Sequence, residues 1–592
     1  MTPQAIVNAR AKALLGLMAV AGVLFCARLF YLQVIRHDYY EQQAVAEHEK
    51  KFTIPAKRGT IYARDRDGIT PLVLNEPVYL LYADPRYIKN PERAADRIAT
   101  ITGGNAAAYK DLLSDDKKPY VVLEKKINKT QADAIKKVSS SESTKSEMFG
   151  IGLKDNQQRV YPEGSLASQL LGFVNDEGDG QYGIEGKLND RLKGQDGLLK
   201  AVTDVGGVPL SIGTDNVMKP AKNGDNLLLT VDRNVQGYAE EALKKGLDKV
   251  GATKGSALVM NPTNGDIVAM ANYPTYNPTD YAKVEDFHNF QNNTVSDPYE
   301  AGSDIKVLTM ASGLNTNAIN ENSTFYNKGY VQVEDTVIKN VEKDVGETTM
   351  EQILQNSLNT GVVFILQQLG GGQINKQSRD KLFDYFTKRF GFGEKTGVEQ
   401  AGEQPGILYT PDDEQGNNVR YANMTFGQGM TTTMVQVAAA FTSVINGGTY
   451  YAPHLVDGTV DDTTGQVKEQ LPSVVRKNVV SEGTSAAIRQ MTSQALSNTL
   501  ALKMATRDGY IIGGKTGTSQ IIDPKTGKYS DENAIGTYVG FGGNETPRYV
   551  IMIRVDDSKL GAGDYAGTAA AAPIFADISN WLLDYYKVPP IK

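Results

Sequence analysis

The sequence predicts an α+β protein with one N-terminal transmembrane helix and two or three folded domains. At 592 residues the chain is too long for one hydrophobic core. A mostly apolar run follows a short basic N-terminus, which is typical of a membrane anchor. In the last part of the chain, strand-like segments stand at both ends with helical segments between them. That order favours one antiparallel sheet flanked by helices.

Composition narrows the possible functions. Hydrophobic residues make up 40% and charged residues 22% of the chain, which is ordinary for a folded protein. The net charge of −7 and the lack of basic clusters argue against a nucleic-acid partner. Cys26 is the only cysteine, so a disulfide framework or thiolate metal site within one chain is excluded. The four histidines are scattered singly and none has metal-ligand spacing, so no metal is expected: His37, His48, His288 and His454.

The mostly apolar run covers residues 13–35, and Arg28 is its only charged residue. As a helix it would span about 34 Å, enough to cross a bilayer. Residues 1–12 carry Arg10 and Lys12 and no acid, which predicts a cytoplasmic tail and places the rest of the chain outside. A cleaved signal peptide is the alternative, but the small residues at 19–21 come too early for its cleavage site. An uncleaved anchor is favoured.

The region from residue 36 to 220 contains no recognisable group of catalytic residues. Short strands are expected around an Asp-Gly turn within 58–75 and again at 77–85, and residues 90–137 read as amphipathic helix. Glu185 is a candidate acid, but it has no paired carboxylate, so a structural role is favoured. A boundary is expected near residues 223–225.

The remaining chain, 221–592, alternates between strands and helices. Strands are expected first, then mainly helices from 348 to 450, then strands again and a closing helix. The closing helix is expected at 568–586. The expected strands are 227–231, 256–260, 266–270, 510–520, 536–542 and 549–556.

Ser303 and Lys306 are the first candidate catalytic residues. Gly302 ends an irregular approach and a helix-compatible run follows, so the two side chains would stack on one helix face. A serine hydroxyl is a weak nucleophile until a base takes its proton, and a lysine whose pKa is lowered by burial or nearby cations can be that base. The spacing alone carries little weight, since Ser114 and Lys117 repeat it in a charged loop.

A second polar pair, Ser357 and Asn359, lies within the helical sequence 350–369. The serine could shuttle a proton between an amine and a leaving group. The asparagine amide could hold a substrate carbonyl and the lysine. Two polar residues on a helix surface are the ordinary alternative.

A Lys-Thr-Gly sequence at 515–517 is the third element. The same three residues occur at 395–397 and 525–527 in turn-rich sequence, whereas 515–517 lies in a strand. Lys515 would supply a fixed positive charge, either for a carboxylate or to lower another lysine's pKa. Gly517 would let a substrate backbone lie against the strand edge.

The three elements occur in order, at separations of 54 and 158 residues. Together they are far more specific than any one of them, and the chain resembles the class B penicillin-binding proteins, which are monofunctional peptidoglycan D,D-transpeptidases. The resemblance covers nearly the whole chain and fits division-type members best. Other segments that carry it are 58–61, 159–174, 183–186, 271–274 and 425–429.

The resemblance implies a domain plan and a location. Residues 1–12 would be a cytoplasmic tail, 13–35 the anchor, 36–220 an elongated mixed α/β pedestal or dimerisation-like domain, and 221–592 the penicillin-binding transpeptidase domain. The protein would lie in the bacterial plasma membrane with its catalytic domain outside. There it would cross-link peptidoglycan stem peptides at the septum. Its anchor and pedestal would bind a membrane glycosyltransferase or polymerase and other division proteins.

The resemblance also implies a serine acyl-enzyme mechanism with no metal or organic cofactor. Ser303 would attack the carbonyl between the two terminal D-alanines of a stem peptide, and Lys306 would take its proton. Ser357 would pass a proton to the leaving D-alanine, and Asn359 would position the peptide. β-Lactams would acylate Ser303 and remain there.

In the same mechanism the strand that follows Gly514 binds the other end of the substrate. Lys515 would contribute a positive charge to the site. The hydroxyls of Thr516 and Thr518 would bind the terminal carboxylate of the substrate. The oxyanion would lie between the backbone N–H groups of Ser303 and Thr518.

Two residues depart from the family pattern. Ala301 stands where relatives usually have proline, and Asp304 where they have a small or hydroxylic residue. On a helix the Asp304 side chain would point about 100° away from Ser303. It could pair with a lysine, shape β-lactam affinity or lie at the surface.

Two other functions are weighed against the transpeptidase. A β-lactamase needs a glutamate to activate water, and Glu394, Glu399 and Glu403 lie in range without the asparagine expected to follow. A β-lactam sensor would need a signalling domain larger than twelve cytoplasmic residues. A non-catalytic division scaffold is opposed by the intact motifs.

Overall fold

The computed structural model describes residues 3–40, 49–66, 68–141, 147–202, 217–341, 345–522, 529–558 and 566–591. The chain forms two compact units. The first comprises residues 1–57 and 194–224, and the second comprises residues 58–193 and 225–592. The region expected as a pedestal thus contributes to both units.

The first unit contains the anchor helix and a small sheet. Helix α1 (Pro3–Phe30) continues into a π-helical turn, η1 (Tyr31–Ile35). The stretch Ala11–Ile35 has a mean hydropathy of 2.2 and is long and apolar enough to cross a membrane, as expected for a single-pass membrane protein. Strands β1 (Glu49–Ile54), β8 (Gly197–Val202) and β9 (Val217–Lys219) form an antiparallel sheet in the order β1-β8-β9.

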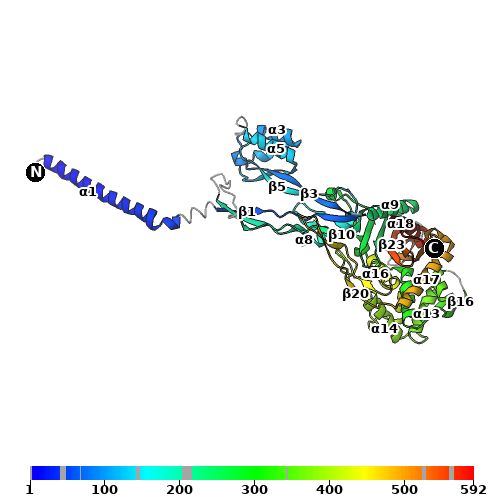
Figure 1. Cartoon of the computed structure of the whole chain (residues 1–592). Helices are drawn as coiled ribbons and strands as arrows, with labels where there is room; N and C mark the ends of the chain where they lie inside the picture. The colour runs from blue at the N-terminus through cyan, green and yellow to red at the C-terminus, as the bar shows by residue number, and fades with distance from the viewer. Residues whose placement is uncertain are drawn as a thin grey trace. The chain divides into compact units, whose positions relative to one another are not determined.

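The second unit contains a sheet to which distant parts of the chain contribute (Figure 1). Its order is β19-β18-β10-β2-β3-β4, with β5 also paired to β3. The strands are β2 (Ile61–Asp65), β3 (Gly68–Ala83), β4 (Val121–Ile127), β5 (Ile151–Val160), β10 (Leu227–Asp232), β18 (Val456–Val460) and β19 (Val467–Glu469).

Two sequence expectations for this sheet were wrong. The segments expected as separate strands at 71–75 and 77–85 are one long strand, β3, because β5 pairs with it continuously from Leu74 to Ala83. The stretch 90–137 is not helical throughout, because β4 lies within it. Helices α3 (Pro91–Thr102), α4 (Ala106–Leu113) and α5 (Lys129–Ser140) bury Ile98, Tyr109, Leu113 and Ile135 against this part of the sheet.

A five-stranded antiparallel sheet forms the centre of the C-terminal part, which confirms the predicted fold class. Its order is β12-β11-β23-β22-β21, so strands from both ends of this part lie side by side. The strands are β11 (Lys254–Met260), β12 (Ile267–Tyr273), β21 (Ile511–Ile522), β22 (Tyr529–Gly543) and β23 (Pro547–Ser558).

Alternation along these strands produces two hydrophobic cores. Val259 and Ile551 face one side, where α9 (Arg233–Val250) and α18 (Ala572–Tyr585) pack near β23 (Figure 1). Leu258 and Met552 face the other side, toward the helical region. Because side chains alternate between the faces of a strand, one continuous apolar run supplies both cores.

The helical region begins with a short 3₁₀ turn, η6 (Gly302–Asp304), and α11 (Ile305–Asn315). The other helices here are α12 (Met350–Gln355), α13 (Asn359–Leu369), α14 (Lys376–Asp384), α15 (Asn418–Met424), α16 (Met434–Ile445) and α17 (Glu482–Asn498). Small antiparallel pairs join β13 (Thr324–Asn327) with β16 (Gly346–Thr349), β14 (Tyr330–Val333) with β15 (Thr336–Lys339), and β17 (Tyr450–Tyr451) with β20 (Val474–Arg476).

Short elements complete the second unit. Helical ones are η2 (Pro85–Tyr87), α6 (Ser168–Leu171), α7 (Gly183–Lys187), α8 (Asn189–Lys193), η4 (Pro278–Lys283), η5 (Phe287–Phe290), α10 (Asn293–Ser296), η7 (Tyr385–Arg389), η8 (Leu500–Ala505) and η9 (Gly567–Ala571). Strands β6 (Phe173–Val174) and β7 (Gly180–Gln181) pair with each other.

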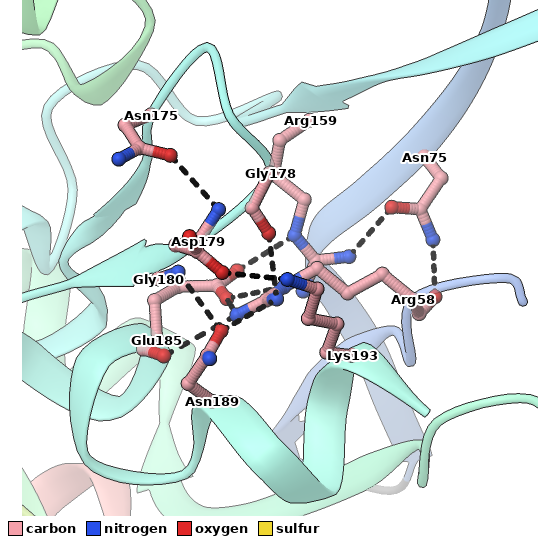
Figure 2. Close-up of polar contacts among 10 residues, drawn as sticks. All are labelled: Arg58, Asn75, Arg159, Asn175, Gly178, Asp179, Gly180, Glu185, Asn189 and Lys193. Carbon is pink, nitrogen blue, oxygen red and sulfur yellow. Dashed lines mark hydrogen bonds and ion pairs between the residues drawn. The ribbon is translucent and has the colours of Figure 1, made fainter. Parts of the chain in front are cut away.

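A buried carboxylate joins the N-terminal sheet to α7 and α8. Figure 2 shows Glu185 between two arginines, with its side chain fully buried. Arg58 donates to Glu185 Oε2 at 2.7 Å through Nε, and Arg159 Nε donates to Oε1 at 2.6 Å. Arg58 also donates to Asn189 Oδ1, and Arg159 to Asn75 Oδ1. These contacts agree with the structural role that was favoured for Glu185 because the sequence offers it no paired carboxylate.

Replacement of this carboxylate tests its structural role. We expect Glu185→Ala to cost about 3–5 kcal/mol, since both arginines would keep a desolvated charge without its partner. Urea unfolding of the detergent-solubilised chain measures the loss. Asp179→Ala is the matched control, because its ion pair with Lys193 (2.6 Å) is about half exposed and should matter little. Equal effects of the two substitutions would contradict the assignment.

Candidate active site

The turn that carries Ser303 is packed tightly between two backbone segments. Gly302 has φ +60°, and a Cβ added there would lie 2.8 Å from the carbonyl oxygen of Thr518. On its other side Gly302 N–H donates to the carbonyl of Gly427 at 3.2 Å. Between residues 301 and 314 every residue is buried except Ser303, which is partly exposed. The fold thus presents one hydroxyl at the end of a buried helix.

Lys306 lies below this hydroxyl and is linked to it through Ser357. Its Nζ donates to the Ser357 carbonyl oxygen at 2.5 Å and lies 3.0 Å from Ser357 Oγ. Ser357 Oγ in turn lies 3.0 Å from Ser303 Oγ. Hydroxyl groups rotate, so this chain of contacts can carry a proton in either direction. The side chains of the first two sequence elements therefore meet.

Burial changes the chemistry of this lysine. Lys306 is 1% exposed, and this desolvation lowers its pKa well below the ordinary lysine value, with the positive charge of Lys515 adding to the effect. A neutral amine at neutral pH can accept a proton, which an ordinary surface lysine cannot. The site thus supplies a base without a histidine.

Ser357 occupies a break between two helices, and the expected continuous helix over 350–369 was wrong. Helix α12 ends at Gln355 and α13 begins at Asn359. Ser357 has φ +51°, a left-handed conformation that costs a non-glycine residue of order 1–3 kcal/mol. This conformation exposes both the carbonyl and the hydroxyl of Ser357 to Lys306, which a continuous helix would not allow.

Strand β21 supplies the third element as the edge strand of the five-stranded sheet. Lys515 and Gly517 are buried, whereas Thr516 and Thr518 are half-buried, as strand alternation requires. Lys515 Nζ donates to the carbonyl and hydroxyl oxygens of Thr516 at 3.0 and 3.3 Å. Thr518 Oγ1 accepts a long hydrogen bond, 3.5 Å, from the backbone of Gly567.

Gly517 is required by packing inside the protein. A Cβ at this position would lie 2.2 Å from Thr537 Oγ1 and 2.8 Å from the carbonyl oxygen of Ala301. Contacts below 3.0 Å cannot be accommodated without movement of the backbone. The absence of a side chain at Gly517 therefore lets the turn that carries Ser303, the proposed nucleophile, approach β21; we call residues 301–304 the nucleophile turn.

Asn359 lies at the first residue of α13 and points elsewhere than expected. Its amide donates to the carbonyl of Lys339 at 3.0 Å. Within the described residues it makes no hydrogen bond to Lys306. Asn359 therefore borders the site without entering the Ser303–Ser357–Lys306 chain.

Sequence reasoning gave no role to residues 425–429, although this segment supports the nucleophile turn. Gly427 accepts from Gly302, and Gly429 N–H donates to Glu300 Oε1 at 2.7 Å. Gly427 has φ +78°, and a Cβ there would lie 2.2 Å from the Gly302 carbonyl oxygen. The closely spaced glycines were the available sequence signal.

The two repeated motifs that the structure describes make other contacts. Ser114 is exposed at the end of α4, and its hydroxyl donates to the carbonyl of Lys110. Thr396, in the copy at 395–397, donates to Glu403 through both its backbone and its hydroxyl at 2.6 Å. The copy at 525–527 lies outside the described residues. Among the residues that are described, no three His, Cys, Asp or Glu side chains are grouped as metal ligands.

Comparison with known families decides the affiliation. Residues 255–580 match the model of the penicillin-binding protein transpeptidase domain, and residues 53–229 match the penicillin-binding protein dimerisation domain. The chain is a class B penicillin-binding protein. The expected resemblance is confirmed by these two matches, which together cover most of the chain.

Curated relatives match this penicillin-binding protein over nearly its full length. Stage V sporulation protein D of Bacillus subtilis is 32% identical over 98% of this chain and 87% of its own. A Pseudomonas aeruginosa protein named as a probable peptidoglycan D,D-transpeptidase is 29% identical over 98% of this chain and 96% of its own.

Solved structures share the fold. Penicillin-binding protein 3 from Mycobacterium tuberculosis, in complex with aztreonam, is 24% identical with a TM-score of 0.67, over 91% of this chain and 98% of that one. A peptidoglycan synthetase from Bifidobacterium adolescentis is also 24% identical, with a TM-score of 0.69, over 92% of this chain and 98% of its own.

The packing around Gly517 generates a prediction. Gly517→Ala should cost about 1–3 kcal/mol, because the new methyl group pushes β22 and the nucleophile turn apart. Thermal unfolding measures the change. Gly483→Ala, in α17, is the control, since a Cβ added there would lie 4.0 Å from Ser481 Oγ and a helical alanine should be neutral or slightly stabilising. A Gly517→Ala protein as stable as this control would contradict the packing argument.

Proposed function

We propose that this penicillin-binding protein is a peptidoglycan D,D-transpeptidase that cross-links stem peptides through an acyl-enzyme on Ser303. The observation that carries the proposal is the hydrogen-bonded chain from Ser303 through Ser357 to the buried Lys306. It joins a partly exposed nucleophile to an amine whose pKa is lowered by burial. This pairing is what acyl transfer by a serine requires.

In the first step Ser303 Oγ attacks the carbonyl carbon between the two terminal D-alanines. Its proton passes to Ser357 Oγ while the Ser357 proton passes to Lys306 Nζ, following the 3.0 Å contacts between these atoms. The C–N bond then breaks, and the proton returns along the same chain to the leaving amine of D-alanine. The proton route through Ser357 refines the expectation that Lys306 takes the proton directly.

The second step transfers the acyl group to an amine of a neighbouring stem peptide. That amine attacks the Ser303 ester and gives its proton to Lys306 through Ser357, and Ser303 recovers a proton as the new amide forms. The backbone N–H groups of Ser303 and Thr518 are proposed to bind the oxyanion in both steps. The close approach of Gly302 to the Thr518 carbonyl, which brings these two segments together, supports this pairing.

Recognition of the substrate's terminal carboxylate is assigned to β21. The half-buried hydroxyls of Thr516 and Thr518 face the accessible side, and the buried ammonium of Lys515 contacts Thr516. Asn359 is proposed to contact the peptide part of the substrate, since its side chain is only partly buried at the edge of the site. β-Lactams carry an equivalent carboxylate and acyl group, so they should acylate the same serine.

The cellular setting is also a proposal. The basic N-terminus predicts that residues 1–12 lie in the cytoplasm and the catalytic domain lies outside the bacterial plasma membrane. Relatives named stage V sporulation protein D and peptidoglycan D,D-transpeptidase FtsI homolog support a septal role. A glycosyltransferase or polymerase and other division proteins remain the proposed partners of the anchor and the N-terminal region.

Two of the three glutamates considered for a β-lactamase are engaged by backbone groups, and the third is exposed. Glu399 Oε2 accepts from the backbone of Leu455, and Glu403 holds the turn at 396–397. Glu394 is largely exposed. These contacts favour a long-lived acyl-enzyme with β-lactams over their rapid hydrolysis.

Labelling with a fluorescent penicillin tests the proposal. We expect the detergent-solubilised chain to form a one-to-one adduct that intact-mass and peptide mapping place on Ser303, and Ser303→Ala to lose at least 1,000-fold in rate, as expected when the nucleophile is removed.

Ser114→Ala, in the repeated motif, is the matched control and should label normally. Rapid loss of the wild-type adduct with release of hydrolysed drug would favour a β-lactamase. An adduct on another residue would overturn the assignment of Ser303.

A further inference from the structure

Asp304, the residue after the nucleophile, is buried in the protein. Its side chain is 1% exposed, so the surface role considered for it was wrong. Neither carboxylate oxygen has a hydrogen-bond partner among the described residues. The Thr537 hydroxyl and the Asp304 carboxylate both lie against Gly517, and this hydroxyl favours the ionised carboxylate.

The position of Gly517 locates this carboxylate. A Cβ at Gly517 would lie 3.0 Å from Asp304 Oδ1, so the carboxylate lies directly against β21. Gly517 is two residues from Lys515, and residues two apart on a strand share a face. Asp304 therefore lies on the face of β21 to which the Lys515 side chain belongs, beneath the half-buried threonines.

Lys515 is the cation whose charge acts on Asp304. Burial raises the pKa of Asp304 to about 7, with Thr537 and the positive charge of Lys515 opposing the rise. Burial lowers the pKa of Lys515 to about 8, with the charge of Asp304 opposing that fall. Among the described residues Asp304 and Lys515 form no salt bridge. Their charges therefore interact at longer range, through the low-dielectric interior between β21 and the nucleophile turn.

The other titratable groups around Asp304 leave Lys515 as its main counter-charge. Tyr299 and Tyr538 are buried neutral phenols, with pKa values raised by burial and then by Asp304. Beyond Tyr299, Arg554 lies 4.5 Å from the ring centroid but is engaged by two carboxylates, Asp297 and Asp556. On α11, Lys306 faces Ser357 instead.

An unpaired buried carboxylate is costly, and such groups gather at functional sites where their charge is used. We propose that Asp304 is a positioning residue that keeps Lys515 in its ammonium form, and thereby extends recognition of carboxylate-bearing substrates to higher pH. The inference rests on the proposed function, in which the threonines of β21 face the terminal carboxylate of the substrate and the Lys515 ammonium contacts Thr516.

The sign of the effect follows from the two groups. A negative charge near a buried amine stabilises the ammonium, so neutralising Asp304 should make Lys515 lose its proton at lower pH. The carboxyl is itself protonated well below its pKa of about 7, where it carries no charge to remove. Wild type and a neutral variant should therefore behave alike below about pH 6 and diverge above it.

The test compares acylation of the full-length, detergent-solubilised protein by benzylpenicillin and by its methyl ester, from pH 5.5 to 9.5. For Asp304→Asn we expect the rate with benzylpenicillin to match wild type at pH 5.5. It should fall about fivefold at pH 8 and about tenfold at pH 9, as a drop of roughly one unit in the pKa of Lys515 implies. With the ester, which lacks the carboxylate, the variant and wild type should differ by less than about twofold.

Controls separate this role from a structural one. Asp304→Thr restores the kind of side chain that relatives carry and should repeat the Asp304→Asn profile, and it serves as the test if Asp304→Asn does not fold. Asp248→Asn removes an exposed carboxylate from α9 and should leave both profiles unchanged.

A loss that is equal at every pH, or equal for penicillin and ester, would overturn the inference and leave Asp304 a packing residue. Failure of the proposed function would look different, because the wild-type protein would then form no Ser303 adduct at any pH.

Discussion

Burial of two amines beneath a layer of hydroxyl groups is the constraint on which the site depends. Lys306 and Lys515 are 1% and 5% exposed, while Ser303, Ser357, Thr516 and Thr518 remain partly accessible above them. Two ammonium groups close together in a low-dielectric interior repel each other, so ionisation of one opposes ionisation of the other.

The structure resolves this competition by giving the two amines different surroundings. Lys306 makes hydrogen bonds with the carbonyl and the hydroxyl of Ser357. A neutral amine can make these contacts as well as an ammonium group can. Lys515 belongs to β21, Asp304 lies on the same face of that strand, and the pKa of Lys515 falls only to about 8. One amine is thus suited to accept protons and the other to hold a charge, although both begin as the same residue type.

The fold brings these groups together by close backbone packing. The nucleophile turn lies between β21 and the segment 425–429, and at Gly302, Gly427 and Gly517 a side chain would collide with neighbouring atoms. The five-stranded sheet behind the turn is supported by a separate core on each face. A rigid sheet edge and a buried helix are the kind of support that keeps catalytic groups within small tolerances.

Order and spacing along the chain predicted the fold class and the apolar anchor helix, and they singled out three segments that remain the proposed catalytic segments. Sequence reasoning missed features that depend on tertiary contacts. The stretch 350–369 has helical character throughout, and the contact between Ser357 and Lys306, 51 residues earlier, is not visible in the local sequence. Asp304 was expected to point away from Ser303, and the sequence could not show that β21 and β22 bury its side chain. Strand β4 lies between helices α4 and α5 in the chain, and it was missed in a stretch expected to be helical.

The protonation state of Lys306 is the central claim of this account, and nuclear magnetic resonance measures it directly. With ¹³C at the ε-carbon of lysine, the signal absent from Lys306→Met identifies this residue in the wild-type protein. The account predicts that its chemical shift is that of a neutral amine at pH 7.5 and that the ammonium forms only at lower pH. A Lys306 signal that remains that of an ammonium up to pH 9 would contradict the account, because no other base lies in the hydrogen-bonded chain to Ser303 within the described residues.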